Sequence, residues 1–251
     1  MFLEGSFLGI LPQMPVPTYT VTCTKNVLIV RDVYEFALSK PPGFIFEPGQ
    51  YVLFDVPLVG DPADIQPRAF SLAALPEEPD LLFIAKLVPG GRMSRFVAES
   101  LSAGTTILMK GPMGRFVLDR TTDNRLLFVA TGTGIAPFRP QILALLAADP
   151  LRRIDLIFGV RTEQDLFWMD MFRDLERKHP NVHFHPTLSA GSSSWGGHRG
   201  RVQAVIPQIV TDFSRLSLYA CGNPEMTKGV KHLALTQWGM GKEDVHVEGY
   251  I

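Results

Sequence analysis

Hydrophobic positions in the first half of the chain fall into short runs whose length and composition predict β-strands. Proline and glycine pairs, for example Pro48-Gly49 and Pro89-Gly90, separate these runs and predict tight turns. One stretch, Met93–Leu101, instead carries apolar residues at helical spacing. Antiparallel strands interrupted by a single helix predict a small closed barrel. The predicted strands are Val27–Val30, Tyr51–Val56, Ala69–Ala74, Leu81–Val88 and Thr105–Met109.

From Arg125 onward the pattern changes to uninterrupted apolar runs that alternate with longer helical stretches. Because both faces of such strands must be covered, they predict a parallel sheet with helices on either side. The predicted strands are Leu126–Ala130, Ile154–Val160, Val182–Phe184, Leu216–Cys221 and Val245–Val247. The predicted helices are Phe138–Ala148, Trp168–Lys178, Val202–Val210 and Glu225–Trp238. We therefore expect an N-terminal extension (residues 1–17), a barrel domain (18–120) and an α/β domain (124–251).

Composition limits the kinds of protein this chain can be. With 251 residues, 46% of them hydrophobic, and a net charge of −1, it is neither a disordered chain nor a nucleic-acid binder that works by bulk charge. Its two cysteines, Cys23 and Cys221, are too few for an iron–sulfur cluster or a cysteine-rich zinc site, and His183 with His185 is an isolated pair. No apolar run is long enough to cross a bilayer, and no basic residue precedes Lys25. We expect a cytoplasmic protein without a metal site.

A glycine-rich turn is the first candidate binding site. Thr131-Gly132-Thr133-Gly134 directly follows a predicted buried strand, and Pro137 stands just before the next predicted helix. Glycines let the backbone approach a ligand, and the free N–H groups at a helix start attract an anion such as a pyrophosphate. A tight strand-to-helix turn without a ligand is the alternative. The position of the glycine-rich segment after the first strand of a parallel sheet favours a binding site.

Two further segments, both in the barrel half, suit a phosphate and an aromatic ring. Gly90-Gly91 precedes Met93-Ser94 at the start of the predicted helix, although Ser94 could simply cap a glycine turn. In Arg68-Ala69-Phe70-Ser71, the residues at 68 and 70 share one strand face and Ser71 points to the other. Neither segment is specific by itself.

Taken together, these segments resemble the ferredoxin-NADP(H) reductase family. Six motifs of that family occur in order, from about residue 18 to the end of the chain. They are Arg68–Ser71, Gly90–Ser94, Gly111–Phe116, Gly132–Pro137, Cys221–Met226 and Glu248–Tyr250. The resemblance implies a β plus α/β fold, in which an antiparallel six-stranded flavin-binding β-barrel precedes a Rossmann-like five-stranded parallel sheet that binds NAD(P).

On this resemblance the barrel half binds FAD rather than FMN, because two phosphate-suited segments lie within it. Arg68 is expected to pair with the pyrophosphate, and Phe70 to lie against the flavin where the family usually has tyrosine. Ser71 is expected to hydrogen-bond near the flavin nitrogen that accepts hydride. The expected FAD-binding residues are Arg68, Ala69, Phe70, Ser71, Gly90, Gly91, Met93, Ser94, Thr133 and Tyr250.

In the second half, the resemblance places the coenzyme phosphates on the glycine-rich turn and the nicotinamide beside Cys221. A small buried side chain at a strand end is the alternative for Cys221, and simple packing is the alternative for the terminal aromatic Tyr250. The expected catalytic residues are Ser71, Cys221, Glu248 and Tyr250. The expected NAD(P)-binding residues are Gly132, Thr133, Gly134, Arg161, Ser189, Cys221, Gly222, Pro224 and Met226.

The choice between the two nicotinamide coenzymes depends on three positions. Arg161 ends the second parallel strand, where an arginine suits the 2′-phosphate of NADP. Ala190, however, follows Ser189 where NADP-using relatives often have arginine, and similar NADH-using oxygenase reductases also carry an arginine near position 161. We therefore favour NADH over NADPH by a small margin.

The implied reaction passes hydride from NAD(P)H to the flavin, which can release electrons singly to an acceptor protein. Seven basic against three acidic residues between Lys86 and Arg125 give this segment a net charge of +4. That charge suits an acidic ferredoxin or flavodoxin as partner, with a solvated rim as the alternative. Three other functions stay open: a reductase of free flavin or another small acceptor, an electron-transfer subunit of a larger complex, and a flavin-binding module without turnover. A monomer is slightly favoured.

Overall fold

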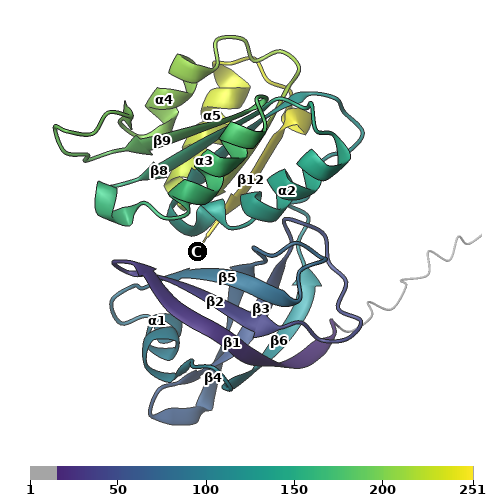
Figure 1. Ribbon diagram of the computed structural model, residues 1–251, viewed down its shortest axis with the longest axis vertical. Coiled ribbons are helices and arrows are strands. Elements are labelled where there is room, and N and C mark those ends of the chain that lie inside the picture. The colour runs from purple at the N-terminus through teal and green to yellow at the C-terminus, as the bar shows by residue number, and fades with distance from the viewer. Residues whose placement is uncertain (1–15, 251) are drawn as a thin grey trace, which may run out of the picture.

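Two six-stranded sheets, one antiparallel and one parallel, organise the computed structural model of the protein, which describes residues 16–250. Figure 1 shows the antiparallel sheet below, the parallel sheet above, and the C-terminal strand directed at the seam between them. The predicted N-terminal extension lies outside the described residues except for Val16 and Pro17. No helix among residues 16–250 is long and apolar enough to cross a membrane.

The antiparallel sheet confirms the six strands expected of the first half. In space the strands run in the order β4-β3-β6-β1-β2-β5. Just past β4, the N–H of Ala73 donates to the carbonyl of Leu82 in β5 over 2.9 Å, which brings the two ends of the sheet together. The strands are β1 (Thr18–Val30), β2 (Val33–Ser39), β3 (Tyr51–Leu58), β4 (Asp61–Ser71), β5 (Asp80–Lys86) and β6 (Thr106–Met113).

Alternating side chains build the core of this barrel. In β3, Val52, Phe54 and Val56 are fully buried, as expected of a strand with one face inward. The predicted helix is present as one turn, α1 (Arg92–Arg95), that continues into the wider π-helical turn η1 (Phe96–Ser100). The Asn26 amide donates to the carbonyls of Val97 and Leu101 at 2.8 and 2.7 Å, so it satisfies carbonyls that the helix end leaves free.

The parallel sheet contains all five predicted strands and one more. The additional strand, β10 (His198–Arg199), pairs with Thr187 and Leu188. The expected number was therefore one too low, because two residues carry no periodicity. The other strands are β7 (Arg125–Thr131), β8 (Ile154–Val160), β9 (Val182–Leu188), β11 (Leu216–Gly222) and β12 (Val245–Gly249), in the spatial order β10-β9-β8-β7-β11-β12.

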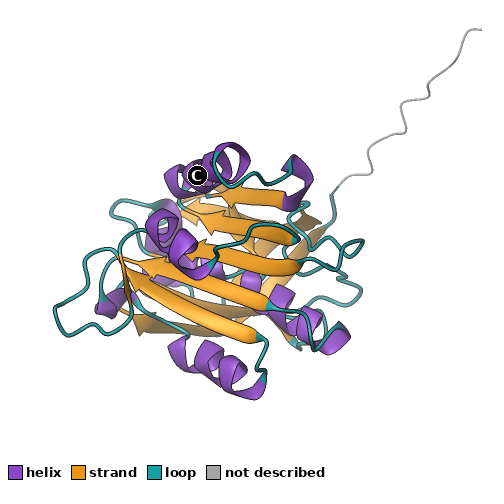
Figure 2. Ribbon diagram, turned by 90° about the horizontal axis from the view of Figure 1, so that it is seen from above, coloured by secondary structure: helices purple, strands orange, loops and turns teal. Residues whose placement is uncertain are grey.

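Helices cover both faces of this parallel sheet (Figure 2). The helices α2 (Phe138–Ala148) and α3 (Met169–Lys178) pack on the face that carries Phe128 and Phe158. The opposite face, with Leu127 and Val129, packs against α4 (Val202–Ile209) and α5 (Pro224–Thr236). Three short 3₁₀ turns complete the described elements: η2 (Gly132–Ile135), η3 (Glu163–Asp165) and η4 (Lys242–Asp244).

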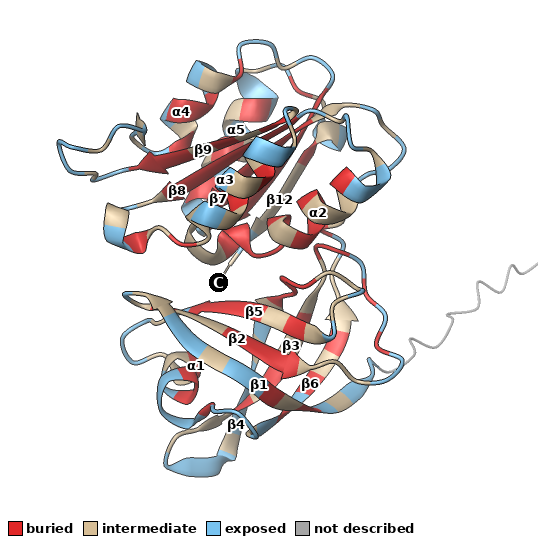
Figure 3. Ribbon diagram, in the orientation of Figure 1, coloured by how far each residue is buried: buried red, intermediate tan, exposed pale blue. Residues whose placement is uncertain are grey.

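The two halves share one hydrophobic core across the seam. Ile84 and Phe116 of the first half belong to the same buried cluster as Phe128 and Phe138 of the second, and Figure 3 shows buried residues on the strands of both sheets. At one point of the seam, the Arg139 guanidinium donates to both carboxylate oxygens of Glu78. β6 ends at Met113 and β7 begins at Arg125, so the predicted boundary falls in the connecting segment; the domain limits themselves stay a prediction.

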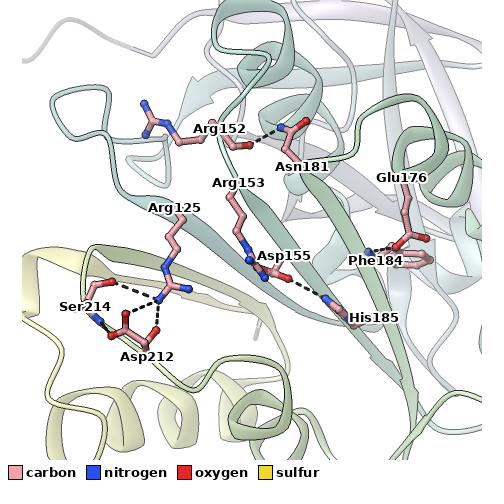
Figure 4. A network of polar contacts seen from close by, with 10 residues as sticks. All are labelled: Arg125, Arg152, Arg153, Asp155, Glu176, Asn181, Phe184, His185, Asp212 and Ser214. Carbon is pink, nitrogen blue, oxygen red and sulfur yellow. Dashed lines mark hydrogen bonds and ion pairs between the residues drawn. The ribbon is translucent and has the colours of Figure 1, made fainter.

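Ion pairs and hydrogen bonds secure the outer part of the parallel sheet (Figure 4). Asp155 of β8 accepts hydrogen bonds from Arg153 and from His185 of β9, both at 3.0 Å. In β9, the N–H of Phe184 donates to the Glu176 carboxylate of α3 at 3.0 Å. Because β10 pairs only with the last residues of β9, this contact covers a backbone group of an edge strand.

The Asp155→Asn variant is expected to lose about 2–3 kcal/mol of unfolding free energy at neutral pH, because it replaces a buried carboxylate that accepts two hydrogen bonds. Burial alone would raise the pKa of Asp155, but hydrogen bonds from His185 and Arg153 hold this pKa below its usual range. The carboxylate therefore contributes fully above its ordinary pKa, and the difference from wild type should shrink as the pH falls through the lowered value.

Urea unfolding at a series of pH values measures this difference. The matched control is Asp174→Asn, which removes an exposed carboxylate paired with Arg177 and should change stability by less than about 0.5 kcal/mol. Equal stabilities of the two variants at pH 7 would contradict the assignment.

Candidate active site

The glycine-rich turn lies where the strand order of the parallel sheet reverses, between β7 and its neighbours β8 and β11. Such switch points are where open α/β sheets form ligand crevices. A Cβ atom on Gly134 would lie 2.2 Å from the carbonyl oxygen of Cys221, so only glycine allows this approach of η2 to β11. Gly132 has φ +53 and open space around it. The turn thus combines close backbone packing with an accessible backbone.

The end of β11 is built to complement this turn. Gly222 has φ +130, and a Cβ atom there would lie 2.5 Å from the carbonyl oxygen of Thr131. Asn223 caps α5, because its side-chain oxygen accepts from the N–H groups of Glu225 and Met226 at 2.9 and 3.2 Å. The Cys221–Met226 motif is therefore a buried strand end followed by a capped helix start.

A cleft of about 430 Å³ opens at this edge of the sheet and reaches the barrel. Its walls include most of the residues expected to bind NAD(P). Those that line it are Gly132, Thr133, Arg161, Ser189, Gly222, Met226 and, from the FAD set, Tyr250. Gly134, Cys221 and Pro224 stand directly beside these residues without lining the cleft. The structure thus brings together residues that are up to about 120 positions apart in the sequence.

Several residues of the cleft were missing from the expected set. Asn223 and Glu225 directly follow a parallel strand, where ligand-binding residues are expected, so their position was a sufficient signal. Arg201 and Gln203 follow a Ser/Gly-rich loop that carries no such mark. Contacts between the halves, which no local pattern encodes, bring in the barrel residues. The residues missed are Val33, Lys86, Thr131, Gly159, Val160, Asp165, Phe167, Gly200, Arg201, Val202, Gln203, Asn223 and Glu225.

The four expected catalytic residues meet at the seam. Ser71, at the end of β4, has its hydroxyl 3.1 Å from the Tyr250 hydroxyl and 3.4 Å from a Glu248 carboxylate oxygen. The Tyr250 hydroxyl also lies 3.5 Å from the carbonyl oxygen of Thr133 and close to the Cys221 thiol. A residue of the barrel thereby contacts the end of β12 and the glycine-rich turn at a single point.

Burial in this cluster shifts the pKa of each titratable side chain toward its uncharged form. Burial raises the pKa of the Cys221 thiol well above its ordinary value, and it raises the pKa of Tyr250 as well. Burial also raises the pKa of Glu248, and the hydrogen bond from Ser71 offsets only part of this increase. These shifts disfavour a thiolate at Cys221 and suit the cluster to orienting ligands through hydrogen bonds.

The barrel brings the two other candidate segments close together. Arg92, at the start of α1, donates to the carbonyl oxygen and the carboxylate of Asp64 in β4, at 2.5 and 2.7 Å. Arg68, further along β4, bonds to Pro67 and Gln66 and joins no ion pair among residues 16–250. A bidentate cation without an acidic partner fits a bound pyrophosphate. This donor set fits FAD.

Three other expected FAD contacts serve the barrel itself. The Ser94 hydroxyl accepts from the N–H of Val88 at 2.7 Å, so it closes the glycine turn and keeps its own hydrogen for another acceptor. Phe70 packs with ring centroids 5.7 Å from both Phe36 and Phe54 and remains half-buried. The Met93 side chain lies in the core, which leaves only its backbone for a ligand. Ala69, Gly90 and Gly91 add accessible or half-exposed backbone.

No group of three or more His, Cys, Asp or Glu residues within the described part of the chain could hold a metal ion. Among these residues, His183 and His185 have ring centroids 6.4 Å apart, and His185 is bonded to Asp155. His185 is therefore engaged in the contact between β8 and β9.

Sequence comparison supports both halves. The profile of the oxidoreductase FAD-binding domain matches residues 20–118, and the profile of the oxidoreductase NAD-binding domain matches residues 128–232. The ferredoxin--NADP reductase B of Sorangium cellulosum (strain So ce56) is 34% identical over 227 residues, which cover 87% of this chain and 91% of that protein. The naphthalene 1,2-dioxygenase system ferredoxin--NAD(P)(+) reductase component of Pseudomonas putida is 31% identical and matches 85% of this chain. The match covers 62% of that longer relative.

Solved structures share the arrangement of the two halves. The Amycolatopsis cytochrome P450 reductase GcoB superimposes with a TM-score of 0.84 at 28% identity, over 95% of this chain and 72% of that one. A ferredoxin NADP+ reductase from Neisseria gonorrhoeae with bound FAD and NADP has the same fold, with a TM-score of 0.80 at 23% identity, over 93% and 99% of the two chains. With its six motifs, its two sheets and a relative matched over nearly its full length, this chain belongs to the ferredoxin-NADP(H) reductase family of FAD- and NAD(P)-binding oxidoreductases.

Proposed function

We propose that this protein is an FAD-dependent reductase that takes electrons from NAD(P)H and passes them to a ferredoxin-type acceptor protein. The observation that carries the proposal is the contact between Ser71 of the barrel and Tyr250 at the end of β12, beside the cleft. This contact brings the end of β4, whose residues suit FAD, next to the cleft, whose residues suit NAD(P). The name of the Sorangium relative supports the acceptor class.

The residues divide into three roles. Arg68 and the backbone around Gly90-Gly91 would hold the FAD pyrophosphate, while Gly132 and Thr133 would hold the coenzyme phosphates. FAD, when bound, accepts a hydride from NAD(P)H and releases electrons singly. Ser71 would donate a hydrogen bond at the hydride-accepting edge, and Tyr250 would exclude water until the nicotinamide takes its place. Bringing two rings into contact in this way supplies much of the rate.

NADH is our favoured coenzyme, by a small margin. Arg161 and Arg201 both line the cleft, and neither joins an ion pair among residues 16–250, so a 2′-phosphate would find positive charge. Beside Ser189, however, Ala190 supplies no further cation. The ratio of kcat/KM for NADH and NADPH measures the preference, and a strong preference for NADPH would contradict it.

An acidic ferredoxin or flavodoxin is the partner we propose. Five of the seven basic residues between 86 and 125 lie within 4 Å of a carboxylate, at 2.7 to 3.9 Å, which lowers the net positive field of this segment. Arg115 and Arg120 have no such partner among the described residues. Docking on this charge predicts that reduction of the partner slows as salt is raised, with the protein acting as a monomer.

Purification followed by an absorbance spectrum and anaerobic titration tests the function. We expect a bound flavin whose band near 450 nm bleaches on addition of NADH, of NADPH, or of both. A colourless protein that does not take up FAD, or a flavin that neither coenzyme bleaches, would contradict the proposal. Turnover with free flavin but not with any ferredoxin would favour a small-acceptor reductase instead.

A further inference from the structure

Trp168, at the start of α3, has a backbone conformation that its side chain disfavours. Its φ is 57° and its ψ is 17°, in the left-handed region. Trp168 and Arg215 are the non-glycine residues with positive φ among residues 16–250. A bulky aromatic residue is strained there, because its Cβ approaches the backbone, and no side-chain hydrogen bond caps this helix start. Such a conformation persists only where surrounding contacts impose it.

The contact that holds Trp168 in this conformation crosses the seam between the two halves. The indole Nε1–H of Trp168 donates to a carboxylate oxygen of Glu35 in β2, at 2.8 Å and 133 positions away. The other Glu35 oxygen accepts from Lys25 at 2.7 Å, and the Glu35 side chain is only 14% exposed. A hydrogen bond to a shielded, ionised acceptor is stronger than one between neutral groups. The indole ring also packs against Phe167, with centroids 5.6 Å apart.

This hydrogen bond joins the two walls of the cleft. On the α/β side, Asp165 and Phe167 line the cleft within three residues of Trp168; on the barrel side, Val33 lines it two residues before Glu35. Asp165 also faces Lys86 and Arg31, but at 3.9 Å, which is too long for a hydrogen bond. Of these polar contacts beside the cleft, the one between Trp168 and Glu35 is therefore short enough to be a hydrogen bond.

We propose that Trp168 is a positioning residue whose indole N–H sets the angle between the α/β half and the barrel. At that angle a coenzyme bound at the glycine-rich turn faces the flavin site at Ser71. The inference rests on the proposed function, because it assumes that the two sites exchange hydride. The strained backbone fits this role, since it lets the indole N–H reach Glu35 of β2 while the ring stays near Phe172 of its own helix.

The first test separates transfer from binding. The Trp168→Phe variant keeps a ring in place and removes the donor. Because a displacement of about 1 Å can cost up to ~10²-fold in rate, we expect flavin reduction at saturating NADH to slow about 10-fold in stopped-flow measurements. The Kd of the coenzyme should stay within about 2-fold of wild type, because the residues that would hold its phosphates, Gly132 and Thr133, lie in η2 and keep their contacts.

Variants of Glu35 test whether the hydrogen bond is the cause. Glu35→Gln keeps a carbonyl oxygen as acceptor and should reduce flavin at close to the wild-type rate. Glu35→Ala should match Trp168→Phe, and the double variant Trp168→Phe/Glu35→Ala should be no slower than either single one, because both remove the same contact. Arg177→Gln, on the exposed side of α3, is the matched control and should change nothing.

Hydrogen exchange supplies a readout that needs no electron transfer. In the protein without coenzyme, amides of Val33–Ser39 and of residues 163–172 should exchange faster in Trp168→Phe than in wild type or Arg177→Gln. If neither coenzyme bleached the wild-type flavin, the proposed function would fail, and the exchange result would still test the link across the seam.

Three results would overturn the inference. The first is a wild-type rate of flavin reduction in Trp168→Phe, even with a lower melting temperature, because this would limit Trp168 to a structural role. The second is a Glu35→Gln variant as slow as Glu35→Ala. The third is unchanged exchange of both segments in Trp168→Phe.

Discussion

The Gly134→Ala variant is expected to lose about 3 kcal/mol or more of unfolding free energy, a large effect for one methyl group. The added carbon would lie 2.2 Å from the carbonyl oxygen of Cys221, 2.4 Å from its carbonyl carbon and 2.6 Å from the Cα of Gly222. All three atoms belong to the backbone of a central strand, so no flexible side chain can move away. The turn or the end of β11 must shift instead.

The shift should also reach the seam. The N–H of Tyr250 donates to the carbonyl of Gly222 at 2.9 Å, so a displaced Gly222 moves the ring that contacts Ser71. Coenzyme affinity should therefore fall together with stability, as measured by equilibrium titration and by urea unfolding of the same preparation. Where the variant is too unstable to purify, unfolding of the wild type and the controls still sets the scale.

Variants of two other glycines distinguish the effect of a steric clash from the effect of a positive φ. Gly132 has open space around it but φ +53, so Gly132→Ala should cost only about 1–2 kcal/mol of strain. Gly196 has neither a positive φ nor an atom within 4 Å of the added carbon, so Gly196→Ala should be close to neutral. A Gly134→Ala variant as stable as Gly196→Ala would contradict the close approach of the turn to β11.

Most of the architecture follows from patterns that single segments carry. Continuous apolar runs correctly located β8 and β11, and helical spacing located α2, because the residues that define each element lie within it. β2 was not among the predicted runs, since Glu35 interrupts its apolar residues. The interruption has a reason outside the strand: Glu35 accepts the hydrogen bond from Trp168.

The candidate site could be predicted only where a motif marks it. The glycine-rich turn and the Cys221–Met226 motif identify the α/β wall of the cleft, because close backbone packing requires glycine at fixed positions. Lys86 and Val33 line the same cleft from the barrel. Their place depends on how the two halves pack, which is decided by a core shared between them and by no local periodicity.

The family resemblance predicted site residues that the local sequence pattern does not indicate. The C-terminal Glu248 and Tyr250 have no distinctive spacing, yet the structure brings both to Ser71. Conversely, the uneven charge between residues 86 and 125 overstated the free positive surface. Charges are counted along the chain, whereas carboxylates such as Asp64 and Asp212 approach from other elements.

The Ser71→Ala variant is expected to slow flavin reduction by NADH by up to ~10²-fold, if the hydroxyl acts as a pre-organised donor. Ser71 is 7% exposed and is held from two sides by Tyr250 and Glu248. Its oxygen is therefore fixed at the seam, and only the hydroxyl hydrogen, which is donated to Glu248 here, has to rotate toward the flavin. Stopped-flow absorbance near 450 nm measures the rate, and FAD content of the purified variant should equal that of wild type, because the proposed phosphate contacts lie elsewhere in the barrel.

The Ser71→Ala variant should also raise the pKa of Glu248. The hydrogen bond from Ser71 lowers the pKa of Glu248, which burial raises. Removing the hydroxyl should therefore raise this pKa further, as followed by NMR of ¹³C-labelled glutamate or by the pH profile of flavin reduction. A rate within about 2-fold of wild type and an unmoved Glu248 titration would remove Ser71 from the mechanism.

A buried serine away from the seam provides the matched control. Ser217 is 1% exposed and hydrogen-bonds to Asn124 and Asp244 at the far end of β11. Ser217→Ala should cost about 1 kcal/mol of stability, as expected for a lost buried hydrogen bond, and leave the reduction rate unchanged. If Ser71→Ala and Ser217→Ala slowed reduction equally, the effect would come from general destabilisation. A slow Ser71→Ala beside a fast Ser217→Ala places the effect where the barrel meets β12.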